Sequence, residues 1–158
     1  MTSVTILVDV QNIYYTSRET WQCNFDYNAF WRQITAGRTV VKAIAYAIDR
    51  GDEKQRQFQN ILRAIGFEVK LKPFIQRADG SAKGDWDVGI TLDAIEYGQH
   101  SDVLVLASGD GDFDLLVDKL TTKYQTEVEV YGVEGLTAQA LVKAATRFIA
   151  IDEALLLK

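Results

Sequence analysis

Five short apolar runs alternate with segments of helical periodicity, and this alternation constrains the fold more than any other feature of the sequence. The runs lie at 4–9, 40–48, 67–75, 103–108 and 127–132. The first and fourth runs are almost continuously apolar, which is typical of strands buried on both faces of a parallel sheet. Strands that alternate with helices form parallel β-α-β units with right-handed crossovers. The sequence therefore predicts a three-layer α/β domain with a mainly parallel, five-stranded sheet.

The helical segments are marked by apolar residues spaced three and four positions apart. Helices are predicted at 53–67, 86–98, 113–124 and 135–149, and residues 12–36 are expected to form two helical pieces around TWQCNFDYN. In the 86–98 segment, the apolar residues Val88, Leu92 and Ile95 lie on one side of the predicted helix. The polar stretch 76–85 is expected to be a loop. No linker or repeat interrupts the pattern, so residues 1–158 are expected to form one domain.

The composition excludes several classes of catalytic site. Cys23 and His100 are the only cysteine and the only histidine. A zinc enzyme is disfavoured, because zinc sites draw mainly on Cys and His ligands. A hard cation with oxygen ligands is the metal chemistry that remains.

The sequence also bears on the cellular compartment. One cysteine cannot form a disulfide within the chain, which fits a reducing cytoplasm. The N-terminal MTSVTILVDV lacks the basic region of a secretory signal, and the apolar runs are too short to cross a bilayer. We therefore expect a cytoplasmic protein that does not bind membranes.

Charge is distributed unevenly along the chain, which has a net charge of −5. Residues 50–83 contain eight Lys or Arg against four Asp or Glu, whereas residues 84–134 contain two against twelve. This division is compatible with an anionic substrate held by cations and a metal held by carboxylates. Two solvated faces of opposite charge are the other interpretation.

Carboxylates stand where two of the predicted strands end. Asp9 closes the first strand, and Asp110 follows the fourth. If the strand order is 3-2-1-4-5, these strands are neighbours at the switch point where open parallel sheets bind ligands. Asp87 falls in the first turn of the 86–98 helix, at the same end of the sheet. Because three such charges repel unless a cation neutralises them, the sequence predicts a divalent-metal site there.

Several neighbouring polar residues have a structural interpretation as well. Asp112 is expected to cap the helix that starts at Phe113, and Asp85 to cap the 86–98 helix. Asp114 favours its helix N-terminus through the helix dipole. Asn12 could hold a water molecule or a phosphate oxygen, or could cap the first helix.

Competing motifs fail on spacing. DGDFD (110–114) starts like an EF-hand loop, but Leu115 and Thr121 occupy the positions that require Gly and Glu. There is no Walker loop, no Gly-x-Gly-x-x-Gly and no nucleophile elbow around Ser108. A phosphatase with Asp-x-Asp after the first strand is disfavoured because Gln11 replaces the second Asp.

Three stretches, LVDVQNIYY, KGDWDVGITLDAI and VLASGDGDFDLLV, together resemble the NYN domain family in order and spacing, specifically its LabA-like branch within the PIN-like nuclease superfamily. The resemblance implies a PIN-like fold with sheet order 3-2-1-4-5 and ribonuclease activity that depends on Mg²⁺ or Mn²⁺. It places four residues on the acidic and polar site of the family: Asp9, Asn12, Asp87 and Asp110. Asp112 or Asp114 would be the supporting acid, and Lys83 matches the basic residue before the middle Asp.

The expected mechanism is metal-assisted hydrolysis of single-stranded RNA. One or two ions held by Asp9, Asp87, Asp110 and Asp112 would bind the scissile phosphate and lower the pKa of an attacking water molecule. The predicted substrate-binding residues are Lys83, Lys54, Arg56 and Ser108, and further backbone contacts are expected from Arg63, Lys70 and Lys72.

Three aromatic residues have two interpretations. Tyr14, Tyr15 and Trp86 could stack on unpaired bases, or could pack in the core or at its rim. Single-stranded RNA is the expected partner, and a homodimer is an assembly that the sequence permits. The alternative function is a catalytically silent RNA-binding or regulatory module that retains the acidic pocket. A phosphatase for small phosphate monoesters is a third candidate.

Overall fold

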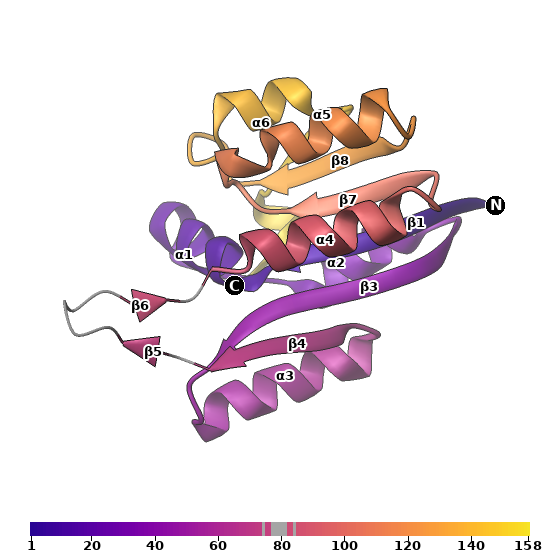
Figure 1. Ribbon diagram of the computed structural model, residues 1–158. Helices are drawn as coiled ribbons and strands as arrows, with labels where there is room; N and C mark the ends of the chain where they lie inside the picture. The colour runs from indigo at the N-terminus through magenta and orange to yellow at the C-terminus, as the bar shows by residue number, and fades with distance from the viewer. Residues whose placement is uncertain (74, 77–81, 84) are drawn as a thin grey trace.

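A six-stranded parallel sheet forms the centre of the molecule. The computed structural model describes residues 1–73, 75–76, 82–83 and 85–158, with only the backbone of residues 75, 76, 82 and 83 (Figure 1). The strand order is β4-β3-β1-β7-β8-β9, and every neighbouring pair is parallel. The strands are β1 (Thr2–Asp9), β3 (Arg38–Asp49), β4 (Glu68–Pro73), β7 (Val103–Ala107), β8 (Glu127–Gly132) and β9 (Arg147–Ala150). The five predicted strands and their order are confirmed, and β9 adds a sixth.

Helices cover both faces of the sheet, which confirms the three-layer architecture. One face carries α1 (Val10–Trp21), α2 (Tyr27–Thr35) and α3 (Glu53–Ile65), and the other carries α4 (Asp87–Gly98), α5 (Asp114–Thr122) and α6 (Gln139–Ala144). None of the helices in the described parts of the chain is long and apolar enough to cross a bilayer.

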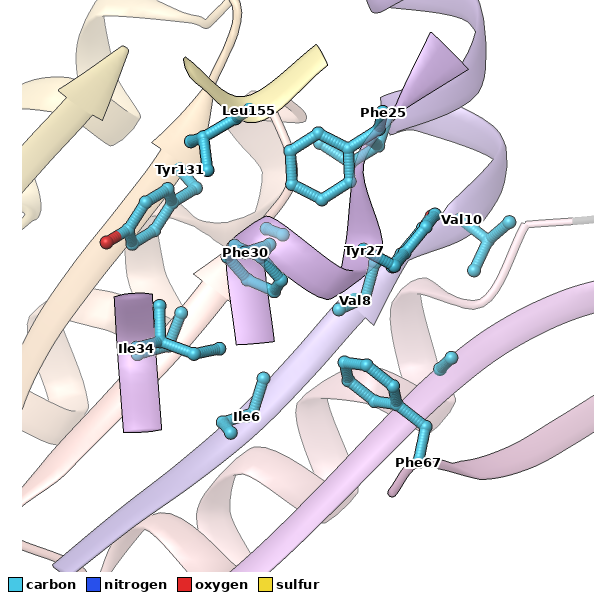
Figure 2. Close-up of a cluster of buried hydrophobic side chains, with 14 of the residues drawn as sticks. Ile6, Val8, Val10, Phe25, Tyr27, Phe30, Ile34, Phe67, Tyr131 and Leu155 are labelled. Carbon is cyan, nitrogen blue, oxygen red and sulfur yellow. The ribbon is translucent and has the colours of Figure 1, made fainter. Parts of the chain in front are cut away.

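The sheet separates two hydrophobic cores. Along β1, Ile6 and Val8 face the α1–α3 side and Leu7 faces the α4–α6 side, as the two-residue period of a strand requires. All three side chains are fully buried. Figure 2 shows the first core, in which Phe30 of α2 packs edge to face on Tyr131 of β8 with a centroid separation of 5.1 Å.

Two short antiparallel pairs complete the fold. β2 (Asn24–Phe25) pairs with β10 (Leu156–Leu157), and β5 (Ile75–Gln76) pairs with β6 (Ala82–Lys83). The second pair lies in the stretch predicted to be a loop, so that prediction is wrong for these backbone segments. The remaining residues of that stretch, 77–81 and 84, lie outside the described residues.

The helix predicted at 135–149 is too long, and its C-terminal part is a strand. The structure has a helix only over α6, followed by β9 at the edge of the sheet. In β9, Phe148 packs against the α4–α6 core and Ile149 against the α1–α3 core. Two adjacent apolar residues therefore serve opposite faces of the sheet, which a single helix surface cannot do.

The side of α4 that faces the core differs from the one marked by the sequence pattern. Ile90, Ala94 and Gly98 are buried, whereas Val88 is 71% exposed and Leu92 is 63% exposed. A Cβ at Gly98 would lie 3.0 Å from a methyl group of Leu104, so the small residues of this face allow close packing on the sheet. The side of α4 that faces the sheet is thus the one whose small residues let the helix backbone approach β7 closely.

Candidate functional site

The candidate site lies at the carboxyl edge of the sheet, where β1 and β7 end side by side. Val8 pairs with Ala107, so Asp9 and Ser108 follow at the same level. The chain leaves β1 toward α1 on one face and leaves β7 toward α5 on the other. This divergence opens the crevice in which parallel sheets bind ligands.

Asp9 is fixed by two hydrogen bonds. Its Oδ1 accepts the backbone N–H of Asn12 at 3.4 Å, which makes Asp9 the N-cap of α1, and its Oδ2 accepts the hydroxyl of Ser108 at 3.1 Å. Burial raises the pKa of Asp9, these two hydrogen bonds lower it, and the nearby charges of Asp110 and Asp85 raise it further. The carboxylate therefore has a defined direction at the base of the crevice.

Asn12 and Ser108 connect the ends of β1 and β7. Asn12 Oδ1 accepts the backbone N–H of Gly109 at 2.8 Å, and Ser108 Oγ accepts that of Asp110 at 3.2 Å. Asn12 does not cap the first helix, because Asp9 takes that place. Ser108 is fully buried, so its hydroxyl acts on Asp9 and on the backbone of the acidic loop.

Asp110, and not Asp112, caps the helical segment that follows β7. A short 3₁₀ helix, η1 (Gly111–Phe113), precedes α5, and Asp110 Oδ1 caps it by accepting the N–H of Asp112 at 2.9 Å. The predicted cap at Asp112 is therefore wrong, and its side chain is exposed. Asp114 lies in the first turn of α5, as expected.

Asp87 lies in the first turn of α4, as predicted, and the adjoining residues hold this turn in place. Asp85 Oδ1 accepts the N–H of Asp87 at 3.2 Å. Trp86 donates its indole N–H to the Ala47 carbonyl at 2.9 Å, so its ring packs against the end of β3. Lys72 donates to the Asp85 carbonyl at 2.9 Å and lies 4.5 Å from the centre of the Trp86 ring.

Carboxylate oxygens of Asp87, Asp110 and Asp112 lie within 4.8 Å of one another, and we call these residues the acidic cluster. The pKa of Asp87 is raised to about 7, first by burial, then by the charge of Asp110 and a hydrogen bond to it, and also by the charges of Asp85 and Asp9. Asp9 borders the cluster and is not one of its three members. Oxygen ligands at this spacing suit a hard divalent cation, whose charge would offset their repulsion.

The predicted basic contacts are dispersed. Lys70 pairs with Asp93 at 2.8 Å on the α4 side, and Arg56 pairs with Glu53 at 3.4 Å on the exposed start of α3. Lys83 belongs to β6, and its side chain lies outside the part of the molecule that the structure describes.

A groove of about 950 Å³ begins directly beside Asp9 and was not predicted. Its walls come from α1, β2, α2, the end of β3 and α3, and Lys54 is among its lining residues. Tyr14 and Tyr15 also line it, with 51% and 53% of their surface exposed, so these two rings lie at a rim. The excess of basic residues in 50–83 was compatible with a substrate surface in this region. The contribution of α2 to the groove could not be inferred, because it depends on how α2 packs in the folded structure.

Comparison with known proteins identifies a family and several similar proteins. The sequence profile of the NYN domain matches residues 3–152. "Low amplitude and bright protein LabA" of Synechococcus elongatus is 30% identical over 120 residues, which are 72% of this chain and 64% of that protein. The chain therefore spans somewhat less than two thirds of the length of that relative. The crystal structure of a protein of unknown function from Vibrio parahaemolyticus is 59% identical, with a TM-score of 0.94 over 99% of this chain and 96% of the other.

Proposed function

Because the chain belongs to the NYN domain family, whose members are generally nuclease-like, we propose that it is a metal-dependent ribonuclease that hydrolyses single-stranded RNA. The observation that carries this proposal is the acidic cluster, whose three carboxylates meet at the carboxyl edge of a PIN-like fold. Carboxylates from two separate parts of the chain would not be held so close for stability alone, because like charges repel.

The donor set fits Mg²⁺ or Mn²⁺. Asp87, Asp110 and Asp112 would hold the ion through carboxylate oxygens, as these cations prefer. A bound ion supplies charge neutralisation at the scissile phosphate and a more acidic water molecule. Because a metal ligand must be deprotonated, Asp87, whose pKa is raised, would release its proton when the ion binds.

The residues around the cluster would act by positioning it. Ser108 bridges the Asp9 carboxylate and the Asp110 backbone, and Asn12 holds Gly109. These bonds fix the direction of the loop before substrate arrives, which lowers the cost of binding the phosphate in a reactive geometry. Asp9 adds negative charge beside the cluster and would help to hold the ion or its water ligands.

The test is cleavage of labelled single-stranded RNA by the purified protein with Mn²⁺, with Mg²⁺ and with EDTA. We expect cleavage with either metal and none in EDTA. Asp110→Asn should reduce the rate by about 100-fold or more, because a neutral amide holds the cation weakly but still accepts the cap hydrogen bond. Asp118→Asn is the matched control, since Asp118 is an exposed acid on α5 outside the cluster.

Two outcomes would contradict the proposal. Cleavage that persists in EDTA, or that is unchanged in Asp110→Asn, would exclude the metal mechanism. RNA binding without cleavage under any divalent metal would support the alternative, a silent RNA-binding or regulatory module. Hydrolysis of an aryl phosphate with no action on RNA would instead support a phosphatase.

A further inference from the structure

We propose that the groove beside α1 binds an unpaired nucleobase of the same RNA strand whose phosphate reaches the acidic cluster. This inference rests on the proposed function and adds a recognition site to it. It is carried by the position of the groove and by two polar side chains that line it and have no hydrogen-bond partner among the described residues.

The groove adjoins Asp9, which borders the acidic cluster. Val10 and Gln11 line the groove and follow Asp9 directly in the chain. Tyr27 lines it as well, and the charge of Asp9 is one of the causes that raise the pKa of the Tyr27 hydroxyl, after burial. A strand with its phosphate at the cluster would therefore have its neighbouring base at the groove.

Two side chains buried along the groove have unused hydrogen-bonding groups. Tyr27 is 8% exposed and Gln59 is 6% exposed, and both line the groove (Figure 2 shows Tyr27). Within the described residues, neither the Tyr27 hydroxyl nor the Gln59 amide has a hydrogen-bond partner, and neither is shielded from solvent as Ser17 Oγ and Trp21 Nε1 are. Both groups reach the open space of the groove and are therefore available to a ligand, so a ligand with both donors and acceptors would be favoured here. The Gln59 amide can donate and accept at once, which matches the edge of a nucleobase.

The remaining lining favours a flat aromatic ligand attached to an anion. Phe25, Phe58 and Ile48 supply apolar surface, and the exposed rings of Tyr14 and Tyr15 stand at the rim, where a base can stack. Lys54 also lines the groove and would attract the phosphate of the same nucleotide. The volume of about 950 Å³ is within the usual range of ligand sites, roughly 300–1,000 Å³.

The experiment measures RNA binding in EDTA, so that cleavage does not interfere. Fluorescence anisotropy compares a single-stranded oligonucleotide of about eight residues with a matched oligonucleotide of abasic residues. We expect the abasic strand to bind at least tenfold more weakly. Gln59→Leu and Tyr27→Phe should each weaken binding of the normal strand by about five- to tenfold, because each removes one buried hydrogen bond. Tyr14→Ala should weaken it by about tenfold or more through lost stacking.

Matched controls separate the groove from general effects on the fold. Gln57→Leu makes the same change on an exposed position of α3 that does not line the groove, and Tyr124→Phe removes a hydroxyl on the α5 side of the sheet. Both should bind RNA like the wild type. Equal affinity for the abasic strand, or unchanged affinity in all three groove variants, would overturn the proposal. So would full displacement of the strand by an equal concentration of a nucleoside monophosphate, because the groove would then bind free nucleotides.

The two proposals fail separately. If Mn²⁺ supports cleavage but the abasic strand binds as well as the normal one, the ribonuclease stands and the base site does not. If binding depends on bases and on Gln59 but no metal supports cleavage, the base site stands and the ribonuclease does not.

Discussion

Gly109 and Gly111 shape the acidic loop by leaving room for a neighbouring segment. A Cβ on Gly109 would lie 2.8 Å from the Leu136 carbonyl oxygen, and a Cβ on Gly111 would lie 2.7 Å from the Ala138 side chain. Neither glycine has a positive φ, so space and not backbone conformation requires them. The Ala138 N–H also donates to the Gly109 carbonyl at 3.1 Å. The loop that holds Asp110 is therefore fixed in place by its contacts with residues 136–138.

Gly109→Ala should displace this loop. The added methyl group meets backbone atoms, which cannot move aside as a flexible side chain could, so we expect the free energy of unfolding to fall by about 1–3 kcal/mol. Mn²⁺ affinity should fall as well, because Asp110 follows directly. Urea denaturation and calorimetric titration with Mn²⁺ measure the two effects. Unchanged stability and metal affinity in this variant would show that residues 136–138 can move to accommodate the methyl group, and would contradict the prediction.

The raised pKa of Asp87 predicts a pH dependence of stability in the metal-free protein. Its pKa is about 7 in the folded state against an ordinary value of 3.8, so the folded state holds more protons between these values. Stability should therefore decrease as pH rises from about 5 to 7, by about 1–2 kcal/mol after allowance for solvent screening. Urea denaturation in EDTA at several pH values measures this slope. Asp87→Asn should remove most of it; an equally steep slope in that variant would contradict the assignment.

At the scale of elements, a buried ion pair connects the start of β3 to β8 across two intervening strands. Arg38 makes two hydrogen bonds to Glu129, at 3.0 and 2.8 Å, and the Glu129 side chain is 5% exposed. Arg147 of β9 lies 3.5 Å from the same carboxylate but is 67% exposed. The Glu129 carboxylate thus has a largely buried main partner, Arg38, and an exposed minor partner, Arg147.

Replacing each arginine by methionine should separate the two contributions. Arg38→Met leaves a buried carboxylate with only the exposed partner, and we expect a loss of about 3 kcal/mol. Arg147→Met should cost less than about 1 kcal/mol, as exposed ion pairs usually do. Urea denaturation at neutral pH compares the two variants. Equal losses of stability in the two variants would contradict the division into a buried main partner and an exposed minor one.

The elements also show what the sequence could predict. Continuous apolar runs identified β1 and β7, because a strand buried on both faces is apolar at successive positions. Because β1 and β7 are neighbours in the sheet, Asp9 and Asp110 lie at the same edge. The pattern did not identify β9, because the Ala-rich stretch before it favours a helix and only pairing with β8 makes 147–150 a strand. It placed Val88 and Leu92 of α4 in the core, where only Ile95 of the three packs, because close packing at Gly98 is a tertiary property.

In the candidate site, too, one part was predicted from the sequence and another was not. Asp9, Asp87 and Asp110 were predicted from their places after strands and at the start of α4, and Asp112 from the family resemblance; three of these four predicted metal ligands form the acidic cluster. The groove was not predicted, because Tyr27 and Gln59 come from separate helices and neither lies in a recognisable motif. Their meeting depends on how α2 and α3 pack against the sheet.

At the scale of the whole molecule, metal binding should stabilise the fold. A ligand that binds only the folded state adds about 2.7 kcal/mol at 100 times its dissociation constant. For a domain of this size we expect Mn²⁺ to raise the Tm by about 5–10 °C. Calorimetric scans with Mn²⁺ and with EDTA measure the shift. Asp110→Asn should lose most of it and Asp118→Asn should keep it; a shift of equal size in both would place the ion elsewhere.

Three helices begin at the acids of the candidate site. Asp9 caps α1, Asp87 lies in the first turn of α4, and Asp110 caps the short helix that leads into α5. The amino end of a helix carries a partial positive charge, so three such ends offset part of the repulsion among the carboxylates. The chain can thus assemble its acids during folding without help from an ion. We expect the protein purified in EDTA at neutral pH to be already folded, with the site preformed and the cation binding after folding is complete.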